Sequence, residues 1–124
     1  MQDEPTPIEL TKAVADFLRN DITPMISGHN AFKLRVAINA LELIVRQLTL
    51  EEGSDTAEAG RLATLLGIQG SLLDQNRALA EKIASGEIDL NTPGLSEHLW
   101  QTTMAKLAVD QPNYASYKRE LGRE

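Results

Sequence analysis

The sequence predicts an all-α protein, a single-domain bundle of about five helices around a central helix near residues 31–50. Three observations favour this class. The run from Phe32 to Leu48 is apolar on most of a helical wheel and contains neither Gly nor Pro. Residues that typically begin or end helices recur along the chain at short intervals. No segment alternates apolar and polar residues over the length of a strand. A helix that is apolar nearly all round is expected to be buried among others.

The elements follow in order. Thr6, Pro7 and Glu9 form a capping-box start for a first helix that runs to about Asn20 and ends before Pro24. The central helix is expected to end between Leu50 and Gly53, and a short third helix to follow from Ser54 or Asp55 to Leu66, with Gly67 as its stop. A fourth helix lies between Ile68 and Ser85, and a fifth runs from Thr92-Pro93 to about Val109. We expect one domain over residues 1–124, with residues 114–124 frayed.

Composition excludes several classes of protein. The chain has 124 residues, 42% of them hydrophobic, which suits one globular domain. A net charge of −6, without a basic stripe, argues against nucleic-acid binding. Without Cys there is no disulfide, catalytic thiol or thiolate metal site. No run approaches the ~20 apolar residues of a membrane span, and the acidic N-terminus is unlike a signal peptide. We expect a cytoplasmic protein with no membrane contact.

The most organised polar feature is a stripe on the central helix. Arg35, Asn39, Glu42 and Arg46 recur at spacings of four, three and four. Two arginines beside an amide could clamp a carboxylate or a phosphate. The alternative, which we favour, is that Glu42 pairs with Arg46 and Arg35 along a solvated edge, where each pair contributes only ~0.2–0.5 kcal/mol.

Three further polar residues are candidates for ligand binding. Asn76 shares a face with Leu72 and Leu79, which predicts a buried amide that fixes helix register, or a ligand contact. His98 and Lys106 lie on one flank of the fifth helix, where His98 could shuttle protons, although a half-exposed structural histidine is commoner. No spacing of histidines and carboxylates indicates a metal site, no nucleophile motif indicates catalysis, and no cofactor is expected. Trp100 is expected in the core, or with Met104 at an interface.

A set of residues between Phe32 and Tyr114 forms a pattern that can be compared with known families. Its members are Phe32, Arg35, Val36, Ala37, Asn39, Ala40, Leu41, Asn76, Ile83, Gly86, Ile88, Asp89, His98, Leu99, Lys106, Leu107, Ala108, Val109, Asp110, Pro112 and Tyr114. In these residues the sequence resembles a small bacterial domain family of unknown function. The resemblance extends from about Asp3 to Tyr114, and its most specific part is the closing segment from Lys106 to Tyr114; Trp100, Gln111 and Asn113 depart from the family pattern. Members are encoded near aminoglycoside-phosphotransferase-like kinases and acyl-CoA dehydrogenases, which implies an accessory domain for such enzymes and brings no catalytic residues.

Three functions remain open from the sequence. The first, which we favour, is a non-catalytic accessory or interaction module, which requires an exposed apolar patch for a protein partner or homo-oligomer. The second is a binder or enzyme for a small anionic ligand, using Arg35, Asn39 and Arg46 with Asn76, His98 or Lys106. The third is a purely structural homodimer.

Overall fold

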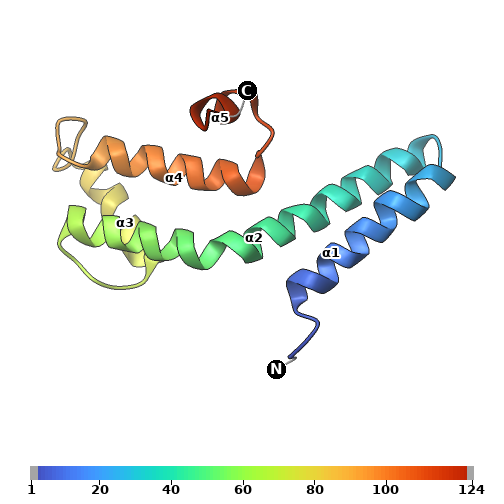
Figure 1. Cartoon of the computed structure of the whole chain (residues 1–124). Helices are drawn as coiled ribbons and strands as arrows, with labels where there is room; N and C mark the ends of the chain where they lie inside the picture. The colour runs from blue at the N-terminus through green and yellow to red at the C-terminus, as the bar shows by residue number, and fades with distance from the viewer. Residues whose placement is uncertain (1–2, 123–124) are drawn as a thin grey trace. The chain divides into compact units, whose positions relative to one another are not determined.

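The computed structural model describes residues 3–122 and is all-α in that range, as the sequence predicts. The α-helices are α1 (Pro7–Phe17), α2 (His29–Leu66), α3 (Leu72–Ala84), α4 (Leu95–Asp110) and α5 (Ala115–Glu120) (Figure 1). A π-helical turn, Leu18–Ile22, and a 3-10 turn, Thr23–Met25, follow α1. No described helix is both long enough and apolar enough to cross a bilayer.

Packing contacts divide the chain into two compact units, residues 1–50 and 51–124. The boundary falls within α2, where the broad apolar pattern of the central run gives way to a narrower one. A single domain over residues 1–124 stays a prediction.

Helix α2 corrects the expected break between a central and a third helix. It is continuous over 38 residues, and Gly53 adopts an ordinary helical conformation instead of the positive φ of a stop. A glycine inside a helix costs only ~1 kcal/mol relative to alanine, which neighbouring helical residues can offset. Gly67 does end the helix as predicted, with φ of 68° and its amide bonded to the carbonyl of Ala63.

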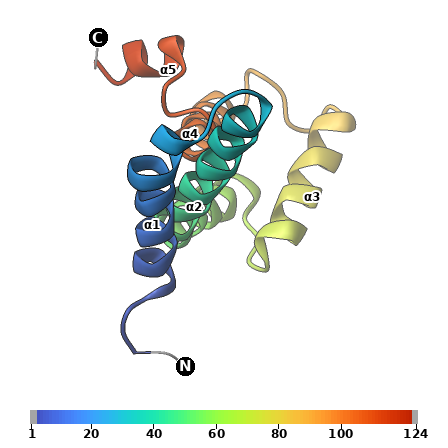
Figure 2. The ribbon, with the colours of Figure 1, turned by 90° about the vertical axis from the view of Figure 1, so that its right-hand side faces the viewer.

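The first unit is an antiparallel helical hairpin, in which α1 lies alongside the first half of α2 (Figures 1 and 2). The predicted capping box begins α1, because Thr6 Oγ1 accepts from the Glu9 amide and Glu9 accepts from the Thr6 amide. Ala15 and Ile38 are the buried residues of the seam, and an ion pair between Arg19 and Glu42 joins the π-helical turn to α2.

The second unit is built by the rest of α2, with α3, α4 and α5. Its apolar core consists of Leu62, Leu79, Ile88 and Leu95, each at most 7% exposed. Val109 and Tyr117 are also buried, so the segment predicted to fray contains a short packed helix, α5. Trp100 is half exposed, and its expected place in the core is wrong.

Candidate functional site

The polar stripe of α2 lies on an exposed side of the hairpin. The side chains of Arg35 and Asn39 are exposed, while Glu42 and Arg46 are half-buried. Glu42 forms an ion pair with Arg19 of the π-helical turn that follows α1. The ligand-binding role of this stripe therefore stays a prediction.

The outer sides of the two hairpin helices are apolar. On α1 the exposed apolar residues recur at intervals of four and three, on the side of the helix away from the buried seam residue Ala15. On α2 they lie on the side away from the buried seam residue Ile38, because residues two positions apart in a helix, such as Val36 and Ile38, point in nearly opposite directions. We call these two outer surfaces together the hairpin face; its eight large side chains, each 38–54% exposed, are Leu10, Val14, Phe17, Phe32, Val36, Leu43, Ile44 and Leu48.

The hairpin face corrects the expectation that the central helix is enclosed. Within its own unit, α2 is covered by one helix only, and a single neighbour covers a narrow stripe of a helix that is apolar nearly all round. At roughly 150–200 Å² per fully exposed large side chain, the eight residues leave on the order of 600 Å² of apolar surface in water. This surface is divided between the outer sides of α1 and α2, and five of the eight residues belong to α2.

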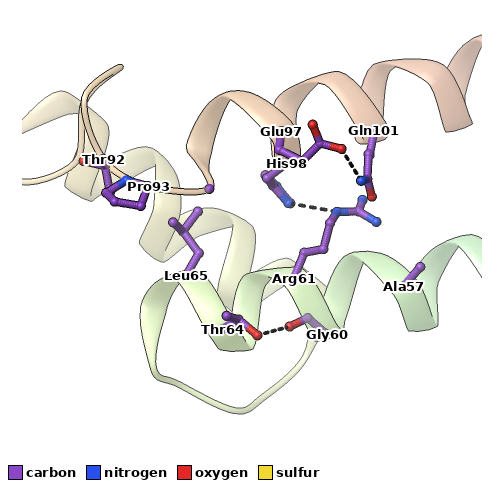
Figure 3. Close-up of a pocket in the computed structure, with 11 residues that line it drawn as sticks. Ala57, Gly60, Arg61, Thr64, Leu65, Thr92, Pro93, Glu97, His98 and Gln101 are labelled. Carbon is purple, nitrogen blue, oxygen red and sulfur yellow. Dashed lines mark hydrogen bonds between the residues drawn. The ribbon is translucent and has the colours of Figure 1, made fainter.

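The second unit contains a pocket of about 580 Å³ between α2 and the start of α4 (Figure 3). Arg61, Thr64 and Leu65 line it from α2, and the segment from Thr92 to Gly94, with Glu97, His98 and Gln101, lines it from the other side. Gly94, with φ of 92°, is the N-cap of α4 and provides no side chain to bond the first amides of that helix. Backbone amides at an uncapped helix start favour negative charge.

Arg61 and His98 meet at the wall of this pocket (Figure 3). Arg61 Nε donates to His98 Nδ1 over 3.4 Å, and Arg61 Nη2 donates to Thr102 Oγ1 over 3.2 Å. Among the described residues no carboxylate lies within ion-pair distance of Arg61. A half-buried guanidinium held by two neutral acceptors retains its positive charge for an incoming anionic group.

His98 is buried, with 3% exposure, so its expected half-exposed position is wrong. Burial of the imidazole lowers the pKa of His98, and the positive charge of Arg61 lowers it further, against the smaller opposing effect of Glu58. The neutral ring therefore accepts at Nδ1 and carries its hydrogen on Nε2.

The other predicted residues of this unit lie apart from the pocket lining. Asn76 is exposed and donates to Glu58 Oε1 over 2.8 Å, so its predicted burial is wrong. The buried amide is the preceding residue, Gln75, with 1% exposure. Lys106 is exposed on α4, two turns beyond His98. In residues 3–122 no three His, Cys, Asp or Glu side chains gather closely enough to hold a metal ion.

Sequence reasoning missed Arg61 and Gln75. Gln75 was as good a candidate for burial as Asn76, because Gln75 lies three residues after Leu72 and four before Leu79, and Asn76 lies four after and three before. Nothing in the spacing of Arg61 relates it to His98, since the two residues are 37 positions apart and meet only through tertiary packing.

The structure thus defines a small protein, all-α over residues 3–122, with an amphipathic hairpin in one unit and a polar pocket in the other. The family described as a domain of unknown function (DUF6285) matches residues 24–114, and the chain belongs to that family. The match includes the α2 part of the hairpin face and the whole pocket lining; α1 precedes it. No curated protein and no solved structure matches the chain.

Proposed function

We propose that this chain is a non-catalytic cytoplasmic interaction module that docks α-helices of another polypeptide on its hairpin face. The observation that carries the proposal is the hairpin face itself, about 600 Å² of apolar surface on the outer sides of a two-helix unit. Further amphipathic helices packed against these outer sides would complete a helical bundle. The proposal includes the kind of partner that the family resemblance implies, which is an acyl-CoA-dependent or kinase-like enzyme.

The test asks whether the hairpin face belongs to the chain's own core. The double variant Val36→Lys, Ile44→Lys places two charges on the face, and Asn39→Lys, on the polar side of the same helix, is the control. Chemical unfolding is measured at submicromolar concentration, where association is weakest. We expect both variants to stay within about 1 kcal/mol of the wild type, because a charge on a solvated surface costs little.

A loss of several kcal/mol in the double variant alone would contradict the proposal, since burying two unpaired ammonium groups is strongly unfavourable. That result would show that residues of the same chain cover the face.

Binding of a small anionic molecule in the pocket is a second candidate function. It is favoured by Arg61, whose half-buried guanidinium has only neutral partners among the described residues. Glu97, bonded to Gln101, places an acceptor on the other wall, so a ligand with an anionic group and a hydrogen-bond donor matches the lining.

Inorganic phosphate and acetate are suitable probes for this pocket, titrated against chloride at constant ionic strength and followed by amide chemical shifts. Saturable shifts around Gly94 to His98 are expected in the wild type and in Arg77→Gln, which removes an exposed arginine of α3. They should disappear in Arg61→Gln. Shifts that are equal in all three proteins, or absent in the wild type, would remove this candidate.

A further inference from the structure

The pocket between α2 and α4 is lined by one cation and one anion. Arg61 contributes from α2, and Glu97 contributes from α4 on the opposite wall. Among the described residues that line the pocket there is no other Lys, Arg, Asp or Glu, and His98 is kept neutral by burial and by the charge of Arg61. The lining therefore has no net charge, but it presents two opposite charges at separate positions.

The guanidinium of Arg61 has one edge engaged by the protein and one edge available. Nε donates to His98 Nδ1 and Nη2 donates to Thr102 Oγ1, and these two nitrogens form one edge of the planar group. Within residues 3–122 no protein atom accepts a hydrogen bond from Nη1. The outer edge, formed by Nη1 and the second hydrogen of Nη2, can therefore donate two parallel bonds to the two oxygens of a carboxylate.

Glu97 presents the complementary charge. Figure 3 shows Arg61 reaching from α2 toward Glu97 and Gln101 of α4. Glu97 is exposed and accepts from Gln101 Nε2 through Oε1, and in the described part of the chain it forms no ion pair. A carboxylate has about four acceptor positions, and this hydrogen bond uses one of them. Glu97 therefore retains its charge and its acceptor capacity for an ammonium group.

This arrangement discriminates between kinds of anion. A phosphate monoester carries close to two negative charges near pH 7, and Glu97 repels the charge that Arg61 does not neutralise. A simple carboxylate matches Arg61 and makes no use of Glu97. A molecule with a carboxylate and an ammonium group has no net charge, like the lining, and pairs with both residues at once.

The size of the pocket suits such a molecule. Its volume of about 580 Å³ lies within the ~300–1,000 Å³ of small-molecule sites. Leu65 and Pro93 also line it, and they provide apolar contacts for the carbon skeleton of a ligand.

We infer that the ligand of this pocket is a small amino carboxylic acid, whose carboxylate binds the outer edge of Arg61 and whose ammonium group binds Glu97. The inference rests on the second candidate function, anion binding in the pocket, since it names the class of ligand for the same site. An anion held by Arg61 alone is the competing outcome of the test.

Matched pairs of probes isolate the contribution of the ammonium group. Glycine, β-alanine and 4-aminobutanoate are titrated beside acetate, propanoate and butanoate, which have the same carbon chains without the amine. The wild type is compared with Glu97→Gln and with the control Glu81→Gln, which neutralises an exposed carboxylate of α3 outside the pocket lining. The full-length proteins are held at pH 7 and constant ionic strength, and amide chemical shifts from Gly94 to His98 report saturation.

We expect at least one amino acid of the series to bind about fivefold more tightly than the acid of the same length, because an ion pair at a partly exposed site adds a factor of this order. Glu97→Gln should remove this advantage, and Glu81→Gln should retain it. An advantage that persists in Glu97→Gln would overturn the inference. Acids that bind as tightly as the amino acids would also overturn it, and would leave anion binding in the pocket as a candidate function. Shifts that do not saturate with any probe would overturn both.

Discussion

Arg61 Nε donates to the Nδ1 atom of buried His98 over 3.4 Å, so the imidazole meets a cation where a carboxylate is commonly found. A protonated imidazole could not accept this bond, and its charge would repel the guanidinium. Burial and the nearby positive charge thus act in the same direction, and both keep His98 neutral.

The stability of the protein should therefore decrease in mild acid through His98. The pKa of His98 is lowered in the folded chain, so the unfolded chain binds a proton first as the pH falls. The contribution of neutral His98 to the free energy of unfolding is complete above the pKa of the unfolded chain, ~6.5, and is lost progressively as the pH falls below it. Unfolding free energies at pH 7.5 and pH 5.5 should differ less in His98→Gln than in the wild type.

Substitution of exposed His29 by Gln provides the control, because it removes the same ring from a solvated position. Equal pH dependence in the wild type and in His98→Gln would show that His98 is already solvated in the folded state.

Gly53→Ala should stabilise the protein by about 0.5–1 kcal/mol, because an alanine in a helix interior loses less backbone entropy than a glycine. An added Cβ at this position meets no atom within 4 Å. Gly67→Ala, at a positive φ of 68°, should instead destabilise by about 1–2 kcal/mol. Unfolding midpoints measure both effects. Destabilisation by Gly53→Ala would mean that α2 ends there, as the sequence pattern predicts.

These glycines illustrate what can be predicted from the sequence. Capping residues act within one turn, so the start of α1 at Thr6 and the stop at Gly67 were both predictable. Gly53 interrupts the helix only if the small free-energy cost of a glycine in a helix exceeds the stability of the helical residues on both sides of it. The pattern at Phe32–Leu48 predicts how much apolar surface must be covered, but it does not say whether the same chain covers it. The pairing of Arg61 with His98 arises from tertiary packing and has no local signal.

The neighbouring amides of α3 should respond differently to truncation. Gln75 is buried, and its Nε2 donates to the carbonyls of Ile68 and Ala59 over 3.2 and 3.5 Å. Gln75→Ala should cost about 2–4 kcal/mol, because it leaves a cavity and removes a donor from two carbonyl groups. Asn76→Ala, on the exposed side, should change stability by less than about 0.5 kcal/mol. Denaturant unfolding of both variants would decide which amide faces the core; the reverse order would restore the predicted register of this helix.

Leu62 is the most buried residue in the core of the second unit, with 0% exposure, and the core also contains Leu79, Ile88 and Leu95. Leu62→Ala should cost about 3–5 kcal/mol, because a fully enclosed site relaxes little around the deleted atoms and leaves a cavity. Leu107→Ala removes the same atoms from a half-buried position on α4, and we expect it to cost about half as much. Chemical unfolding of the full-length variants gives the comparison. Similar losses of unfolding free energy for the two substitutions would contradict this prediction. They would mean that Leu107 is buried more deeply than the structure shows and that the core of this unit is centred between α2 and α4 rather than on Leu62.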